Sequence, residues 1–157
     1  MPSPFFKIAV ALIVSVAVLA TEGRAQTPDA TAAELSSPVG RWTTIDDRTG
    51  KMRAIVVFRE VRGQISGTIE TLLDPSLPDA TCSLCSGALK NKPVVGLRVV
   101  WGFKRNGNQW TGQVLDPETG KTYRALFALE DGGAKLRLRG YVGMPMFGRT
   151  QHWLRAD

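Results

Sequence analysis

The sequence predicts an all-β fold, an eight-stranded antiparallel up-and-down barrel that is closed by pairing of its first and last strands. Apolar and polar residues alternate with a period of two in short segments, which is the pattern of strands with one face in a core. Turn-forming residues separate these segments at close spacing, and no long stretch has helical periodicity. Closure leaves no free sheet edge, and eight strands suffice for it.

The expected strands follow one another along most of the chain. They span residues 39–45, 52–61, 64–72, 97–104, 109–115, 122–129, 135–141 and 149–155. The turns at 46–51 (DDRTGK) and 116–121 (DPETGK) share their chemistry, with glycine where a hairpin needs positive φ. A longer connection at 74–93 holds three prolines and both cysteines. The last expected strand is assigned to pair with the first, which contains Trp42.

The N-terminus has the pattern of a signal peptide. Lys7 precedes the charge-free apolar run 8–20 (IAVALIVSVAVLA), and Ala25 offers a small residue before Gln26. Thirteen apolar residues are short for a bilayer span, so a retained membrane anchor is the weaker alternative. We therefore predict that residues 1–25 are a cleaved signal peptide and that the mature chain is periplasmic or secreted, with no integral span.

Residues 26–38 (QTPDATAAELSSP) are small and polar, and they predict a flexible linker before a single domain at residues 39–157. Residues 1–25 hold two of the 20 basic and one of the 14 acidic residues, so 18 and 13 remain and the net charge is +5. The basic residues are spread along the strands and form no run, so we expect no nucleic-acid partner. Weak attraction to an anionic envelope surface remains open.

Short motifs recur along the whole domain. They are 39–42 (VGRW), 82–85 (CSLC), 92–96 (KPVVG), 110–112 (WTG), 115–117 (LDP), 120–123 (GKTY), 139–143 (RGYVG) and 148–153 (GRTQHW). The Gly40-x-Trp42 pair resembles the start of lipocalin-like (calycin) barrels, and the full set of motifs resembles the bacterial exported domain-of-unknown-function family 2147.

The resemblance implies a small lipocalin-like barrel without an established activity. In lipocalins an arginine of a late strand packs over the tryptophan of the first strand. Here either Arg149 or Arg155 could pack over Trp42, and the sequence does not choose between them. Structural closure is accordingly assigned to Gly40, Trp42, Arg149, Trp153 and Arg155.

Cys82 and Cys85 are expected to form a disulfide in an oxidising compartment. The favoured role is to pin the long connection. Thiol exchange is the alternative, which would require an accessible disulfide. Haem attachment would need a histidine at position 86, where the chain has serine, and a closed zinc site would need more ligands than one histidine and two cysteines supply.

The sequence offers little for catalysis. His152 is the single histidine, and the aspartates fall in turns, where carboxylates bond backbone amides. We expect no enzyme, no cofactor and no metal.

Ligand binding is the favoured function. Aromatic side chains suffice to line a small lumen that takes an apolar or amphipathic ligand, although they could equally fill it. The candidate lumen residues are Trp42, Phe58, Trp101, Phe103, Trp110, Tyr123 and Phe127. A non-catalytic envelope interaction module that uses loops or the outer surface is the alternative.

The segment 143–148 (GMPMFG) is more apolar than a hairpin connection requires. Met144, Met146 and Phe147 would be costly to expose without a use, and methionine suits adaptable apolar surfaces. We expect this loop to fold over one end of the barrel, either as a gate to the lumen or as a permanent plug.

The first testable prediction concerns processing. Exported protein should begin at or near Gln26, because the apolar run and Ala25 define a cleavage site there. Intact-mass measurement of the exported chain checks this, and a mass that retains residues 1–25 would contradict it.

Overall fold

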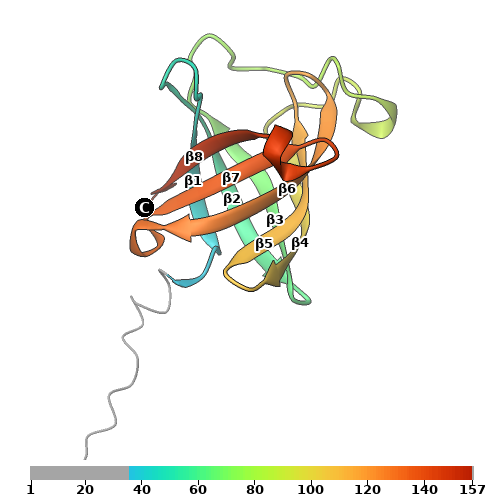
Figure 1. The fold of residues 1–157 in the computed structure, drawn as a ribbon. Coiled ribbons are helices and arrows are strands. Elements are labelled where there is room, and N and C mark those ends of the chain that lie inside the picture. The colour runs from blue at the N-terminus through green and yellow to red at the C-terminus, as the bar shows by residue number, and fades with distance from the viewer. Residues whose placement is uncertain (1–35, 157) are drawn as a thin grey trace, which may run out of the picture.

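The computed structural model of the protein describes residues 36–156, which form eight β-strands and three short 3-10 turns (Figure 1). The predicted signal peptide and residues 26–35 of the predicted linker lie outside the described residues. The strands are β1 (Gly40–Ile45), β2 (Met52–Val61), β3 (Gln64–Leu72), β4 (Arg98–Asn106), β5 (Gln109–Asp116), β6 (Lys121–Glu130), β7 (Lys135–Tyr141) and β8 (Arg149–Ala156). The 3-10 turns are η1 (Gly87–Leu89), η2 (Asp131–Gly133) and η3 (Pro145–Phe147).

Each strand pairs antiparallel with the next, and β1 pairs with β8, so the sheet is a closed barrel. The predicted fold class is confirmed. The seam between the first and last strands is formed by Arg41, Trp42 and Thr43, which face Ala156, Arg155 and Leu154 respectively. Within residues 36–156 the structure contains no helix with the length and apolar character of a membrane span.

The two similar turns use the same hydrogen bonds. Gly50 N–H donates to the Asp46 carbonyl at 2.7 Å, and Gly120 N–H donates to the Asp116 carbonyl at 2.8 Å. Both glycines have positive φ, 70° and 66°. Asp46 Oδ1 also accepts from Thr49 N–H at 2.8 Å, and this bond is the main cause that holds the pKa of Asp46 below its ordinary value. Shared turn chemistry, as predicted, explains the resemblance of the two segments.

The connections divide the barrel into two ends. The β1–β2, β3–β4, β5–β6 and β7–β8 connections lie at one end, which we call the mouth (top of Figure 1). The β2–β3, β4–β5 and β6–β7 connections and the start of β1 lie at the other, which we call the closed end. This follows from the up-and-down order, since alternate connections of such a barrel fall at the same end.

The closed half of the barrel is filled with aromatic rings. Phe127 lies at its centre, with ring centroids 4.9 Å from Phe103, 5.1 Å from Trp110 and 5.6 Å from Phe58. Phe58 in turn contacts Trp42 and Trp153, with centroids 6.3 Å and 5.9 Å away. Tilted, edge-on and stacked pairs at these distances are favourable beyond the area they bury.

Two glycines make room for these rings. A Cβ atom on Gly67 would lie 2.7 Å from Phe58 Cε1, and one on Gly112 would lie 2.5 Å from Phe103 Cδ2. Such distances are far inside van der Waals contact, so each phenyl ring rests directly on the backbone of a neighbouring strand. The glycines are therefore required by packing, and the lumen is solid at this level.

Arg155 seals the closed end over Trp42. Its guanidinium carbon lies 4.4 Å from the centroid of the Trp42 ring, a cation–π distance. The same guanidinium donates to the carbonyls of Gly133, Val39 and Ser37 at 2.8, 3.1 and 2.8 Å. Trp42 Nε1 donates to the Pro38 carbonyl at 2.9 Å. The structure thus chooses Arg155 of the two candidate arginines.

The second prediction tests this seal. Trp42→Ala should lower the free energy of unfolding by about 3–5 kcal/mol, because the ring is fully buried and the surrounding rings cannot collapse into its space. Denaturant unfolding measures the change. Leu84→Ala is the matched control, since Leu84 is 64% exposed and should cost no more than about 0.5 kcal/mol. A Trp42 loss within the control's range would contradict the seal.

Candidate functional site at the mouth of the barrel

The predicted lumen residues occupy three different environments. Trp42, Phe58, Phe103 and Phe127 are 0% exposed and Trp110 is 8% exposed, so all five belong to the aromatic core of the closed half. Tyr123 lies nearer the mouth and is half-buried. Trp101 lies on the outer face of the barrel. The five core residues are packed against one another, and they fill the lower lumen.

Trp101 is on the outer face, which corrects the expectation that it lines the lumen. It pairs with Gln113, which is exposed, whereas its neighbour Val100 pairs with Val114. The register then shifts before Lys104, and Gly102 has φ of 67°. Because a bulge inserts an extra residue, Trp101 and Phe103 lie on opposite faces although they are two positions apart. Strict alternation could not anticipate this.

Smaller side chains than those of the aromatic floor face the half of the lumen nearer the mouth. Gly140 pairs with the buried Ala125, so its face of β7 is the inner one. A Cβ atom on Gly140 would lie 3.7 Å from Tyr123 Cβ and 3.8 Å from Val114 Cγ1, which are ordinary contacts. This contrasts with Gly67 and Gly112, where a ring already fills the space. We call Val114, Tyr123, Gly140 and Gln151 the upper lumen; all four are only partly buried.

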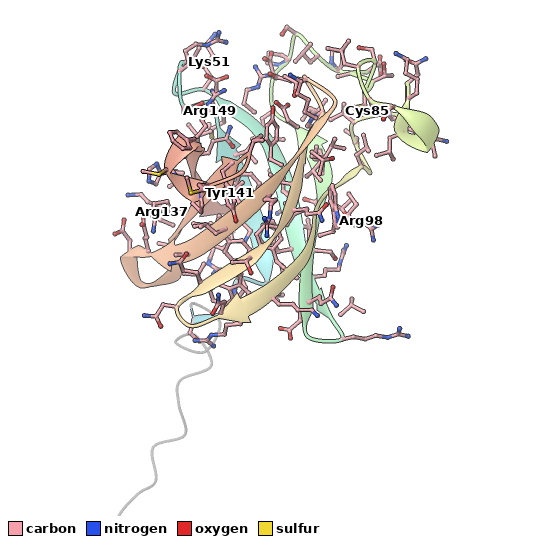
Figure 2. The ribbon with its side chains drawn as sticks, turned by 45° about the vertical axis from the view of Figure 1, so that its right-hand side comes forward. Lys51, Cys85, Arg98, Arg137, Tyr141 and Arg149 are labelled. Carbon is pink, nitrogen blue, oxygen red and sulfur yellow. A yellow bond between two sulfur atoms is a disulfide. The ribbon has the colours of Figure 1, made fainter. Side chains whose placement is uncertain are left out.

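A charged pair borders the upper lumen. Arg149 pairs with Gly140 across the β7–β8 ladder and forms a bidentate ion pair with Asp47 of the β1–β2 turn, in which Nε donates to Oδ2 at 2.6 Å. Figure 2 shows Arg149 at this end of the molecule, below Lys51. The hydrogen bond from Arg149 is the main cause that lowers the pKa of Asp47, and the same bond raises the pKa of Arg149.

The lowered pKa of Asp47 determines how the stabilisation by this ion pair depends on pH. The carboxyl of Asp47 has a lowered pKa in the folded chain, so the pair stabilises the fold above the unfolded value of about 3.9. That contribution is lost as the pH falls through the folded pKa. Arg149 is 65% exposed in its side chain, and the contribution is therefore small. An exposed guanidinium held at the entrance by one carboxylate remains available to a competing anion.

The β7–β8 connection was expected to fold over one end of the barrel, but it lies against the outer surface instead. Arg139, on the outer face of β7, donates to the carbonyls of Pro145 and Met146 at 2.6 and 3.0 Å and to Thr150 Oγ1 at 2.7 Å. These bonds hold η3 against the outside of the barrel, beside β6 and β7 (Figure 1). Met144, Met146 and Phe147 are 58%, 70% and 74% exposed. The loop therefore neither plugs the mouth nor covers it in this structure.

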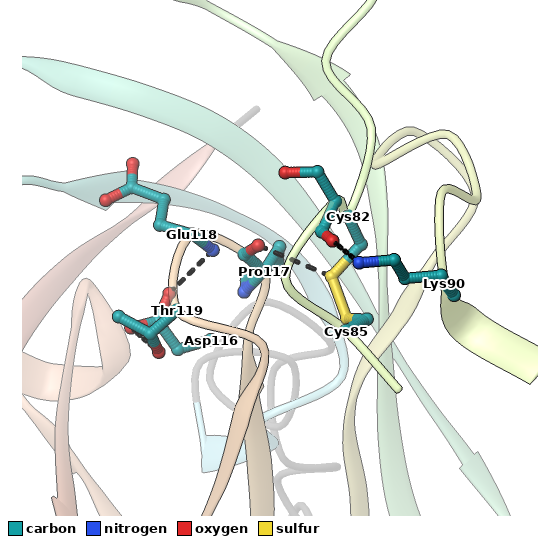
Figure 3. Close-up of a disulfide and its surroundings, with 8 residues drawn as sticks. Cys82, Cys85, Lys90, Asp116, Pro117, Glu118 and Thr119 are labelled. Atoms are coloured by element: carbon teal, nitrogen blue, oxygen red, sulfur yellow. Dashed lines mark hydrogen bonds between the residues drawn. A yellow bond between two sulfur atoms is a disulfide. The ribbon is translucent and has the colours of Figure 1, made fainter. Parts of the chain in front are cut away.

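The β3–β4 connection is pinned at the mouth by the cysteine pair. Cys82 and Cys85 form a disulfide with a Cα–Cα distance of 5.3 Å. Cys82 Sγ lies 3.3 Å from the Pro117 carbonyl oxygen of the β5–β6 turn, and Lys90 Nζ donates to the Ser83 carbonyl (Figure 3). A Cβ atom on Gly120 would lie 2.1 Å from the Leu84 carbonyl oxygen. The connection thus rests directly on the β5–β6 turn.

Burial of the cysteines decides between the two roles considered for them. Cys82 and Cys85 are 0% and 3% exposed. Thiol exchange requires an attacking thiolate to reach a sulfur atom, and such burial blocks its approach. The structural role is the one that the geometry supports.

His152 lies on the outer face of β8, 53% exposed in its side chain, with Nε2 3.9 Å from Glu130 Oε2. Glu130 is also bonded by Arg137 Nε at 2.6 Å, so its carboxylate already belongs to an ion pair. Among residues 36–156, no three His, Cys, Asp or Glu side chains gather into a metal-binding group.

Comparison with known proteins assigns the family. The family model described as "Uncharacterized protein conserved in bacteria", domain-of-unknown-function family 2147, matches residues 40–155. The chain belongs to this family. The fold is similar to that of a solved protein from the human pathogen Helicobacter pylori, described as belonging to the lipocalin family. The two share 21% identity with a TM-score of 0.67, over 77% of this chain and 84% of that one. No curated protein matches the sequence.

Membership of family 2147 agrees with the predicted lipocalin-like barrel, and the Helicobacter protein supports the fold alone at this identity. The sequence missed three features of the site. It gave no sign that Arg139 anchors the β7–β8 loop, that Arg149 pairs with Asp47, or that Gly67 and Gly112 accommodate rings. For Arg139 alone, the alternation of residues along the strand indicated that its side chain, like that of Arg137, faces solvent, but not that it bonds the loop.

The third prediction concerns the disulfide. Replacement of both cysteines by serine should speed amide exchange in residues 74–93 and leave the barrel amides protected, because the bridge closes only a small loop worth about 2 kcal/mol or less. Hydrogen–deuterium exchange with mass spectrometry measures this. Reaction of both thiols with an alkylating reagent in protein purified without reductant would show that the bridge does not form.

Proposed function

We propose that this protein is an exported, non-catalytic barrel that binds a small amphipathic molecule at its mouth. The observation that carries the proposal is the difference between the two halves of the lumen. Phenyl rings rest on glycine backbones in the closed half, whereas a methyl group added at Gly140 would make only ordinary contacts with Tyr123 and Val114. A ligand would therefore occupy the upper lumen and rest on the aromatic floor.

The chemistry of the upper lumen suggests the class of ligand. Val114, Tyr123 and Gly140 offer an apolar surface, and Gln151 Oε1 accepts a hydrogen bond from Trp153 Nε1 at 3.1 Å, which leaves its amide N–H groups available. Arg149 at the entrance would pair with an anionic headgroup in place of Asp47, since a guanidinium binds carboxylate or phosphate with two parallel bonds. A short apolar chain with one acidic group fits this arrangement.

Export is supported by two independent features. The apolar run 8–20 predicts a signal peptide, and the Cys82–Cys85 disulfide is of the kind that persists in oxidising compartments. Pinning the β3–β4 connection would keep the mouth accessible, because the loop is held against the β5–β6 turn. A ligand carrier in the envelope is consistent with both features.

The fourth prediction tests the site with a dansyl-labelled medium-chain fatty acid and its uncharged alcohol analogue. Gly140→Leu should weaken binding of both probes at least about tenfold, because an isobutyl group would occupy the upper lumen; Gly140→Ala, whose methyl fits, is the matched control. Arg149→Gln should weaken the fatty acid by about tenfold or more and leave the alcohol unchanged, since a hydrogen bond to a charged group contributes roughly 1.5–3 kcal/mol. Fluorescence titration measures the dissociation constant of each probe for the parent and for the three variants.

Two results would contradict the proposed site. Binding that is unaffected by Gly140→Leu would place the probe elsewhere on the molecule. Failure of the parent protein, folded by circular dichroism, to bind either probe would show that the upper lumen is not a site for this ligand class.

A further inference from the structure

The β7–β8 loop exposes an unusual amount of apolar surface on one short segment. Val142, Met144, Met146 and Phe147 are 72%, 58%, 70% and 74% exposed. We call these four residues the apolar tip. Single exposed apolar residues are ordinary on a protein surface, but a contiguous group marks an interaction site. The tip lies on the outside of the barrel, so it is separate from the upper lumen.

The tip is held in place rather than left to collapse onto the barrel. The Arg139 guanidinium donates hydrogen bonds to the Pro145 and Met146 carbonyls and to Thr150 Oγ1. Gly148 is packed close, since a Cβ atom there would lie 2.5 Å from the Gly140 carbonyl oxygen and 3.0 Å from Tyr141 Cβ. The backbone of the loop is therefore fixed, and its apolar side chains face away from the strands that hold it.

Exposed basic residues lie on the strands and turns at the same end of the barrel as the tip. Arg124 lies beside Tyr141 in the β6–β7 ladder, Lys121 begins β6 at the mouth, and Arg48 and Lys51 lie in the β1–β2 turn that Asp47 links to Arg149. Figure 2 shows Lys51, Arg149 and Tyr141 on this side of the molecule. All four basic side chains are exposed, and within the described chain none of them forms an ion pair.

The nearby acidic groups each have a partner. Asp47 is paired with Arg149 and Glu118 with Arg53, and Asp46 and Asp116 accept hydrogen bonds within their own turns. The six basic residues on these elements (Arg48, Lys51, Arg53, Lys121, Arg124 and Arg149) outnumber these four carboxylates, so the surface at this end carries a net positive charge. Apolar side chains bordered by basic residues are the composition of elements that lie in the interface of an anionic bilayer.

We propose that the apolar tip docks this protein onto an anionic lipid surface. Met144, Met146 and Phe147 would enter the headgroup region, and Arg48, Lys51, Lys121 and Arg124 would pair with lipid phosphates. A lipid surface is favoured over a protein partner because the tip is small and projects outward. A stable protein interface buries about 1,200–2,000 Å², which four side chains on one loop cannot supply, whereas a bilayer adapts its shape to the tip. The inference is independent of ligand binding in the upper lumen.

The test uses the chain that begins at Gln26, which contains the whole barrel and lacks the apolar run 8–20 that would itself bind lipid. Flotation with phosphatidylcholine vesicles, with and without phosphatidylglycerol, measures the partition coefficient. The parent should bind the phosphatidylglycerol vesicles, and added salt should weaken that binding. Replacement of Met144, Met146 and Phe147 by serine should weaken it at least about tenfold, because three apolar side chains no longer enter the bilayer.

Matched variants separate the contributions of the apolar tip, the basic side chains and the upper lumen to vesicle binding. Val61→Ser combined with Leu154→Ser removes exposed apolar surface at the closed end (61% and 40% exposed) and should leave partitioning unchanged. Arg48→Gln, Lys121→Gln and Arg124→Gln should each weaken binding by about fivefold. Gly140→Leu should bind vesicles like the parent, so that a failure of the upper-lumen site is distinguished from a failure of the tip.

A second readout reports on the tip directly. The Phe147→Trp variant should show a blue shift of its added fluorescence on phosphatidylglycerol vesicles and quenching by brominated lipid. Absence of binding by the parent at low salt, or binding that the triple serine variant retains, would overturn the proposal. So would concentration-dependent dimerisation that is lost in the triple variant, because the tip would then contact a second copy of the chain.

Discussion

The barrel depends on the contact between Trp42 on the first strand and Arg155 on the last. Only three residue pairs join these strands, so backbone hydrogen bonding at the seam is limited. Arg155 adds bonds to three carbonyls from the segment before β1 and from η2, and its guanidinium covers the Trp42 ring. The Arg155 side chain thus connects the start of the domain, its last strand and the β6–β7 turn. The aromatic side chains of the closed half pack above this contact.

The two ends of the barrel have opposite character as a result. The closed end is apolar and tightly packed, so its side chains have little freedom to admit a guest. At the mouth, the connections are held instead by turn hydrogen bonds, a disulfide and surface ion pairs. A division of this kind lets one half of a small barrel supply stability while the other half supplies a recognition surface.

The fold could be predicted from the sequence because strand periodicity and turn chemistry are local signals. The eight strands, their order and the seam followed from alternation and from Gly50 and Gly120 in the turns. The site could not be predicted to the same depth. Trp101 was assigned to the lumen because a bulge at Gly102 is invisible to alternation, and the β7–β8 loop was expected over the mouth because the bonds from Arg139 depend on which way a loop turns. Both outcomes are set by tertiary packing, which a single sequence does not encode locally.

The rings that rest on Gly67 and Gly112 also define how the interior of this scaffold could be remodelled. Each phenylalanine ring occupies the space of a side chain at the glycine of the neighbouring strand, which contributes no side chain of its own. Truncation of Phe103 alone would therefore leave a void bounded by backbone and by the remaining rings. Apolar cavities lined by such side chains can stay dry and accept benzene-like guests, which makes Phe103 the position from which to engineer an aromatic receptor deep in the barrel.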